Sequence, residues 1–92
     1  MGLYFPRMIL ATFEAKRKYD TIVLNPPIRA GKAVVYGLYE KSAFMLNEGG
    51  HLYIVIRKAQ GAKSSIAKLE TLFGTVKIIE RDSGYYVLDC SD

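Results

Sequence analysis

Two kinds of hydrophobic pattern alternate along the second part of the chain. Thr21–Leu24 and His51–Arg57 are short runs that are apolar at nearly every position, which is typical of strands covered on both faces. Between them, from Gly31 to Leu46, apolar residues recur at helical spacing, and Asn47–Gly50 is expected to stop that helix. This order predicts two parallel strands joined by a crossover helix.

A second helical stripe follows the polar stretch from Lys58 to Lys63. Ser64 or Ser65 is expected to cap this helix, and Gly74 stands where a left-handed C-cap is expected. The apolar residues of the stripe are Ile66, Leu69, Leu72 and Phe73.

Two closely spaced runs end the chain. Val76–Ile79 and Tyr85–Leu88 flank Arg81–Gly84, a segment that suits a β-hairpin and is too short for a crossover. Tyr85 and Tyr86 alternate across the strand, so one is expected to point inward and the other outward. The predicted fold is therefore α/β, with parallel strands, helices and a terminal antiparallel hairpin. In such open sheets, ligands bind beyond the carboxyl ends of the strands.

The first 18 residues carry a weaker pattern. Met8–Thr12 suits a preceding strand, and Phe13–Lys18 is a charged connector. We therefore divide the chain into an N-terminal segment, 1–18, of uncertain structure and a folded part, 19–92, with no internal repeat or linker between further domains.

Composition narrows the class of protein without naming a function. Half of the 92 residues are hydrophobic, which is typical of a folded chain. The net charge of +4 is mild and is compatible with a nucleic-acid partner but also with many ordinary enzymes. Leu52–Ile56 is the longest wholly apolar stretch, and the N-terminus shows no signal-peptide pattern, so we expect a cytoplasmic protein. Cys90 is the single cysteine and cannot form an internal disulfide.

The tripeptide Asn25–Pro27 follows the first strand and carries the candidate chemistry. Methyl transfer to an exocyclic amine needs acceptors for the two N–H groups, so that the nitrogen lone pair is aimed at the methyl carbon. The Asn25 side-chain oxygen and the Pro26 carbonyl are the predicted acceptors, and Pro27 stiffens the turn. The alternative is that Asn-Pro-Pro only ends the strand.

Several motifs in order resemble the small-subunit ribosomal RNA guanine-N2 methyltransferase C family, over about residues 19 to 89. They are Asp20–Leu24, Asn25–Lys32, Asn47–Gly50, Arg57–Ser64 and Gly84–Leu88. The resemblance implies the C-terminal half of a class I, Rossmann-like methyltransferase domain. It also implies S-adenosylmethionine as methyl donor, with Asn25 as a cofactor-binding residue, and a guanine of ribosomal RNA as acceptor.

The same resemblance shows two departures from the family pattern. The Gly-rich cofactor loop and the acidic ribose-binding residue lie upstream of Asn-Pro-Pro in the family, and no such loop is found in residues 1–18. We therefore expect a fragment, inactive as an isolated chain, that associates with itself or with an N-terminal half. Many relatives have an aromatic residue after the second proline to stack on the base, where this chain has Ile28.

Basic residues are expected to gather beside the site and to bind RNA phosphates. Arg29 and Lys32 follow Asn-Pro-Pro, and Arg57, Lys58 and Lys63 follow the next strand at the same edge of the sheet. We call these five residues the basic rim. The predicted substrate-binding residues are four members of this rim together with two neighbours: Arg29, Lys32, Arg57, Lys58, Ile28 and Gln60. Gln60 is placed to shape a loop over the base. The alternative for the cations is that they are solvated loop charges, and the alternative for Gln60 is that it belongs to a simple turn.

Two other functions remain as rivals. The chain suits a non-enzymatic module that self-associates through exposed sheet edges and binds RNA weakly through the basic rim. Another nucleotide-binding α/β enzyme is disfavoured, because Gly31-Lys32 is followed by Ala33 and no Gly-x-Gly-x-x-Gly loop is present. His51 and Cys90 lack the partners that metal binding or nucleophilic chemistry requires.

Overall fold

The computed structural model describes residues 19–92, and the strand predicted at Met8–Thr12 lies outside this range. The described elements are β1 (Tyr19–Leu24), the 3-10 turn η1 (Ile28–Ala30), α2 (Lys32–Met45), β2 (Leu46–Arg57), the 3-10 turn η2 (Lys58–Gln60), α3 (Ala62–Glu70), β3 (Thr75–Asp82) and β4 (Tyr85–Ser91). Neither described helix is long and apolar enough to cross a membrane.

The four strands form one mixed sheet in the order β1-β2-β4-β3. β1 and β2 are parallel, with Leu24 opposite Ile54, whereas β4 runs antiparallel to both β2 and β3. The predicted mixed α/β fold, parallel first and antiparallel at the end, is confirmed. Because β1 and β2 are parallel, the loops that hold Asn25 and Lys58 leave the same edge of the sheet.

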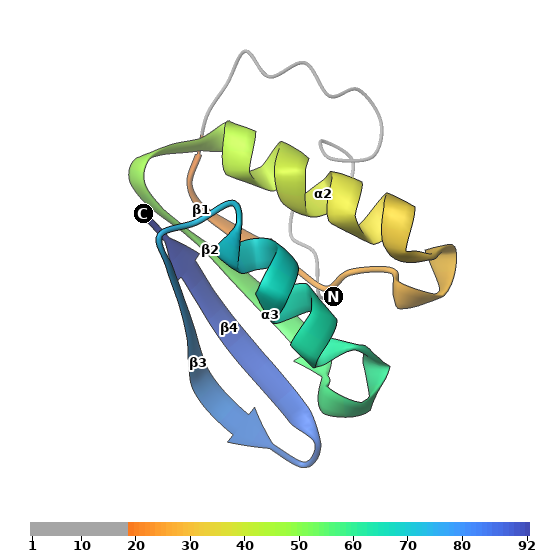
Figure 1. The fold of residues 1–92 in the computed structure, drawn as a ribbon. Coiled ribbons are helices and arrows are strands. Elements are labelled where there is room, and N and C mark those ends of the chain that lie inside the picture. Colours follow the sequence, from red (N-terminus) through yellow and green to blue (C-terminus); the bar gives the residue numbers. More distant parts are fainter. Residues whose placement is uncertain (1–18) are drawn as a thin grey trace.

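Both helices lie on one face of the sheet (Figure 1). The side chains that the strands send to this face form the core together with Leu38, Tyr39 and Leu69. On the opposite face, Tyr53 and Val55 are only half-buried between the buried residues of β2. The strands were predicted to be covered on both faces. Within the residues described, they are fully covered on the face that carries the helices only.

The boundary between α2 and β2 differs from the prediction. α2 ends at Met45 because Leu46 already has an extended backbone, so Asn47–Gly50 lies inside β2 instead of in a loop. The register to β1 shifts there, from Tyr19 opposite Leu46 to Thr21 opposite His51. Gly50 is packed so closely that a Cβ atom would lie 2.9 Å from the Asp20 carbonyl oxygen.

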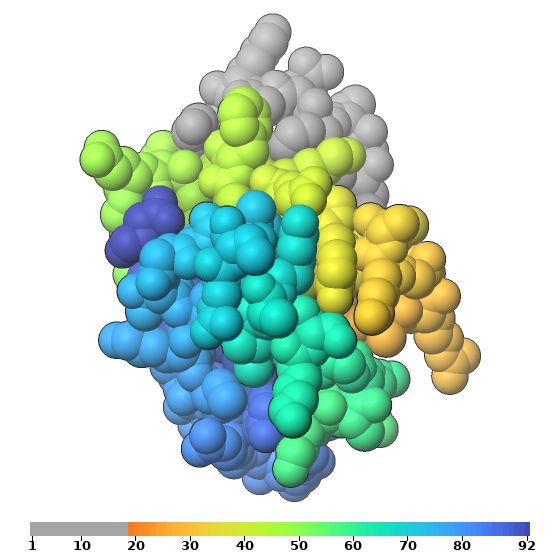
Figure 2. Space-filling view, viewed as in Figure 1, coloured from red at the N-terminus to blue at the C-terminus, as the bar shows by residue number. Residues whose placement is uncertain are grey.

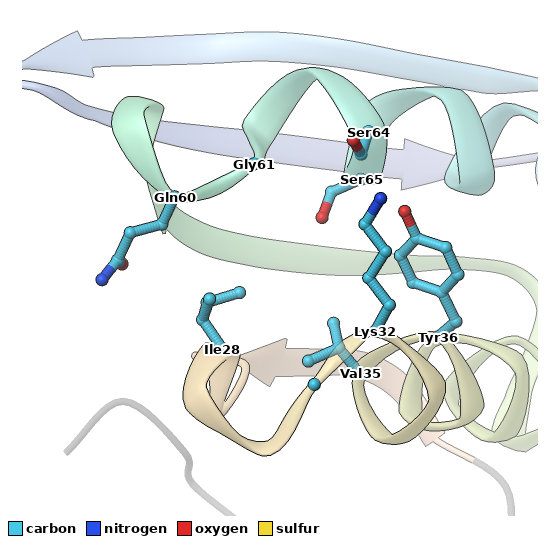
Figure 3. Close-up of a pocket in the computed structure, with 9 residues that line it drawn as sticks. Ile28, Lys32, Val35, Tyr36, Gln60, Gly61, Ser64 and Ser65 are labelled. Carbon is cyan, nitrogen blue, oxygen red and sulfur yellow. The ribbon is translucent and has the colours of Figure 1, made fainter.

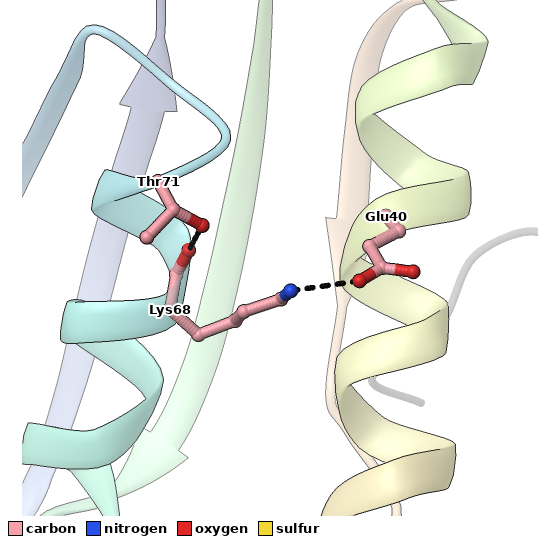
Figure 4. A network of polar contacts seen from close by, with 3 residues as sticks. All are labelled: Glu40, Lys68 and Thr71. Atoms are coloured by element: carbon pink, nitrogen blue, oxygen red, sulfur yellow. Dashed lines mark hydrogen bonds and ion pairs between the residues drawn. The ribbon is translucent and has the colours of Figure 1, made fainter.

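The start and end of α3 also correct the prediction. The helix begins at Ala62, after Gly61 with φ of 83°, so Ser64 and Ser65 lie inside it and do not cap it. Its C-cap is Thr71, whose hydroxyl donates to the Lys68 carbonyl, and Gly74 does not adopt a left-handed conformation. On the outer surface the Lys68 ammonium reaches the Glu40 carboxylate of α2 at 2.7 Å (Figure 4).

The terminal hairpin is tighter than the four residues that the sequence suggested. β3 and β4 are joined by Ser83 and Gly84 alone, and both have positive φ, as the two-residue turns of twisted hairpins require. Tyr86 packs against the core, whereas Tyr85 is exposed. The prediction that one tyrosine points inward and the other outward is confirmed.

Candidate functional site

The loop after β1 has a rigid backbone. Asn25 is exposed, whereas Pro26 is buried. Pro27 has φ of −79° and ψ of 80°, and the Ile28 N–H donates to the Pro26 carbonyl at 2.9 Å, which makes this segment an inverse γ-turn. That hydrogen bond uses one lone pair of the Pro26 oxygen and leaves the second for a further donor.

Gly31 connects this loop to α2 in a conformation that favours glycine. Its φ of 100° and ψ of 160° lie in a region that residues with a Cβ rarely enter. The Gly31 N–H donates to the Ile28 carbonyl at 3.1 Å, and the Gly31 carbonyl accepts from Val35 N–H at 3.1 Å. Gly31 therefore closes η1 and starts α2 within a single residue.

A cavity of about 110 Å³ lies between the start of α2 and the start of α3. Its lining residues are Ile28, Gly31, Lys32, Val35, Tyr36, Gln60, Gly61, Ser64 and Ser65. Figure 3 shows Ile28 and Val35 on one side and Ser65 on the other, with the Lys32 side chain crossing between the two helices. Most of the wall is apolar or backbone, so the cavity suits an uncharged group better than an ion.

The predicted site residues divide between this cavity and the surface around it. Ile28, Lys32 and Gln60 line the cavity. Asn25 lies at the end of β1 and does not line it, and Arg29 is exposed in η1.

The remaining cations of the basic rim continue around the same edge. Arg57 ends β2, where its guanidinium lies 5.0 Å from the Tyr85 ring centre and its Nε donates to the Tyr85 hydroxyl at 2.9 Å. Lys58 starts η2, and its backbone N–H donates to the Gly84 carbonyl at 2.7 Å. Lys63 is exposed in the first turn of α3.

Three cavity residues with polar side chains were not predicted from the sequence. Tyr36 lies one helical turn after Lys32, and that i, i+4 spacing is a signal that was available. Ser64 and Ser65 were assigned to capping instead. Ser65 is buried and shares a hydrogen bond of 2.8 Å with the Tyr39 hydroxyl.

His51 and Cys90 lie away from this edge. The His51 Nδ1 lies 2.7 Å from the Asp89 carboxylate, and residues 19–92 contain no group of three potential metal ligands. Cys90 is fully buried, and burial raises the pKa of its thiol to about 12. The thiol is therefore protonated at neutral pH and is a poor nucleophile in the folded chain.

The sheet order, the crossover helix and the Asn-Pro-Pro loop at a strand end together define an α/β fold of the methyltransferase type. The T. thermophilus 16S rRNA N2 G1207 methyltransferase (RsmC), solved in complex with AdoMet and guanosine, superposes with a TM-score of 0.76. The two are 28% identical, over 80% of this chain and 20% of that one. Residues 5–89 match the family model of the methyltransferase small domain, and the chain belongs to this family.

An uncharacterized protein of Bacillus subtilis (strain 168), YbxB, is 45% identical to this chain over 80 residues. The match covers 87% of this chain and 40% of YbxB, so the chain spans less than half the length of this relative. The expectation of a ribosomal RNA guanine-N2 methyltransferase-like sequence is confirmed by the family match and by the solved neighbour.

The cavity of the candidate site does not by itself fit S-adenosylmethionine. The cavity of about 110 Å³ is well below the roughly 300 Å³ at which pockets for ligands of this kind begin. The described residues begin at Tyr19, and the acidic ribose-binding residue of the family is expected upstream of Asn-Pro-Pro.

Proposed function

We propose that the chain supplies the acceptor side of an S-adenosylmethionine-dependent N-methyltransferase that acts on the exocyclic amine of a guanine in small-subunit ribosomal RNA. The observation that carries the proposal is the rigid turn after β1, in which exposed Asn25 precedes a Pro26 carbonyl with a free lone pair. Family membership and the guanosine complex of the solved neighbour support it.

The proposed role of this turn follows from the chemistry of the amine. The nitrogen lone pair of guanine N2 is delocalised into the ring, which makes the amine a weak nucleophile. The Asn25 side-chain oxygen and the Pro26 carbonyl would each accept one N–H, and the lone pair would then point away from both acceptors. Because the inverse γ-turn fixes the Pro26 oxygen before substrate binds, little conformational entropy is lost on binding.

The surroundings of the turn give the base and the RNA backbone places to bind. Ile28 offers an apolar contact at the cavity, and Gln60 approaches from the facing loop (Figure 3). Arg29 and Lys32 are both exposed next to the turn, where phosphates would reach them. We include Arg57, Lys58 and Lys63 in this phosphate-binding surface.

Methyl transfer to small-subunit ribosomal RNA, with radiolabelled S-adenosylmethionine and a full-length domain reconstituted from this chain and an N-terminal half, tests this function. Asn25→Ala is expected to lower the rate at least tenfold, because it removes a positioning contact to the reacting amine. Asn47→Ala is the matched control, since Asn47 bonds Asp20 at the far end of β1, and it should change the rate less than about threefold. Equal effects of the two variants would contradict the proposed role of Asn25.

A second candidate is a non-enzymatic module that self-associates and binds RNA. Within residues 19–92, β1 is the last strand at one edge of the sheet, and edge strands are where pairing with another chain occurs. Calorimetric titration with S-adenosylmethionine, together with sedimentation, separates the two candidates. Binding of the donor supports the enzyme, whereas a folded oligomer that binds RNA but neither binds the donor nor transfers a methyl group supports the module.

A further inference from the structure

Three hollows lie in a row from the candidate site to the tip of the β3–β4 hairpin. Gly61 lines both the cavity described above and a second hollow of about 400 Å³ between α3 and the hairpin. Lys58 and Tyr86 line this second hollow and also a third, of about 340 Å³, at the hairpin turn. We call the second and third hollows together the hairpin groove. Its charged and aromatic lining residues are Lys58, Lys63, Arg81, Asp82, Tyr85 and Tyr86.

The hairpin groove carries an excess of positive charge. Lys58, Lys63 and Arg81 line it against the single carboxylate of Asp82, which accepts a hydrogen bond from the Ser83 hydroxyl at 3.3 Å. Within residues 19–92, none of these three cations forms an ion pair, so their charge is available to a ligand. All three side chains are exposed.

The groove is also held in place. The 2.7 Å hydrogen bond from Lys58 N–H to the Gly84 carbonyl ties η2 to the hairpin turn. The Arg81 guanidinium lies 5.8 Å from the ring centre of Tyr86, and Tyr86 itself packs against the core. A cation positioned by an aromatic ring loses less side-chain entropy when it binds a phosphate. Figure 2 shows the start of α3 and the hairpin next to each other at one end of the molecule.

We propose that the hairpin groove binds the single-stranded RNA nucleotides that flank the target guanine. Hollows of 340 and 400 Å³ are large enough for nucleotide-sized groups, which require roughly 300 Å³ or more. Cations beside tyrosine rings match a phosphate backbone with stacked bases, the usual combination for single strands. The shared residues Gly61, Lys58 and Tyr86 give a continuous path from the site to the groove.

This inference rests on the proposed function for the identity of the RNA but is tested without the methyl donor. The affinity of the chain for a fluorescein-labelled single-stranded RNA of about 12 nucleotides is measured by fluorescence anisotropy at several salt concentrations. Arg81→Glu is expected to weaken binding roughly tenfold or more. It should also lower the slope of log affinity against log salt by about 0.7 for each phosphate that the variant no longer neutralises.

Lys77→Glu is the matched control, because Lys77 is exposed on the same strand β3 but lies opposite Asp89, away from the hairpin tip. It makes the same change in net charge and should weaken binding less than about threefold. Lys58→Gln, which keeps the backbone hydrogen bond to Gly84, should weaken binding as Arg81→Glu does. Equal weakening by Arg81→Glu and Lys77→Glu would overturn the proposal, since only net charge would then matter.

Two further measurements make each outcome decisive. Thermal unfolding of each variant checks that the fold is kept, and Lys58→Gln, which changes no core residue, gives the test if Arg81→Glu unfolds. A poly-glutamate peptide that displaces RNA at equal charge concentration would overturn the proposal in favour of an acidic protein partner. Because RNA affinity is measured without the methyl donor, failure of methyl transfer and failure of the groove are separate results.

Discussion

The hydroxyl oxygens of Tyr39 and Ser65 lie 2.8 Å apart in the buried layer between α2 and α3. Tyr39 is fully buried, and Ser65 also lines the cavity of the candidate site. This hydrogen bond joins residues 26 positions apart and positions the two helices that form the cavity walls.

Tyr39→Phe is expected to lower the free energy of unfolding by about 1–3 kcal/mol, because the Ser65 hydroxyl is left buried without its partner. Ser65→Ala should cost a similar amount. Urea unfolding of both variants and of the double variant measures the coupling between the two residues. The double variant should lose about 1 kcal/mol less than the sum of the single losses, whereas strict additivity would mean that the hydrogen bond contributes nothing.

Alkaline pH should destabilise the fold through two buried groups. Burial raises the pKa of Tyr39 to about 12 from 10.0 and the pKa of Cys90 to about 12 from 9.0. The unfolded chain therefore loses these protons at lower pH than the folded chain. Their contribution to stability is fully present below pH 9.0 and is lost as the pH rises toward 12.

Urea unfolding across this alkaline range checks the expectation. Each group should contribute a slope of at most about 1.4 kcal/mol per pH unit, and Tyr39→Phe should remove the part that begins at pH 10.0. A wild-type curve with the same alkaline slope as Tyr39→Phe would contradict the assignment to Tyr39.

Two glycines near the site are expected to respond with opposite sign to the same substitution. Gly31→Ala should lower the free energy of unfolding by about 1–3 kcal/mol, because its φ of 100° and ψ of 160° strain any residue with a Cβ. Gly37 lies inside α2 with open space where a Cβ would be added, so Gly37→Ala should raise it by about 0.5–1 kcal/mol. Thermal unfolding distinguishes the two signs.

Ile28→Phe should strengthen the binding of a guanine base if the proposed acceptor site is correct. An aromatic side chain at the mouth of the cavity adds base stacking, which is worth about 1–3 kcal/mol, whereas Ile28→Leu keeps an aliphatic contact and should change binding little. Equilibrium binding of guanosine to the three proteins measures the difference. Weaker binding by the phenylalanine variant would place the base elsewhere.

The fold could be predicted because its signals are local. The apolar run Thr21–Leu24, the helical stripe before Leu46 and the short Arg81–Gly84 connection each report the backbone of their own segment. The crossover rule then gives a parallel pair, and the short connection gives an antiparallel one. The mixed character of the sheet follows from these steps, whereas the pairing of β2 with β4 and not with β3 was not predicted from the sequence.

The errors arise where tertiary contacts override local preference. Ser65 has a good capping side chain, yet Gly61 starts α3 one turn earlier and places Ser65 opposite Tyr39. Asn47–Gly50 has the composition of a loop, yet the close approach of Gly50 to the Asp20 carbonyl draws the segment into β2. Neither partner is near in sequence, so neither contact could be read from the local pattern.

Part of the candidate site could be predicted for a similar reason. The rule that parallel strands end at one edge brings Ile28, Lys32 and Gln60 to one cavity. It does not report which helix faces meet, and so it misses Tyr36 and Ser65. Whether Asn25 and the basic rim act as proposed is decided by the transfer and binding experiments.

The unequal connections within the sheet also bear on how the molecule assembles. β3 and β4 are joined by two residues, so their pairing closes a very short loop, whereas β1 reaches β2 only through the whole of α2. Short loops cost less entropy to close, and contacts between distant segments form late. We therefore expect the hairpin to fold early and β1 to dock last, so that the Asn25 turn takes its final shape only when folding is complete.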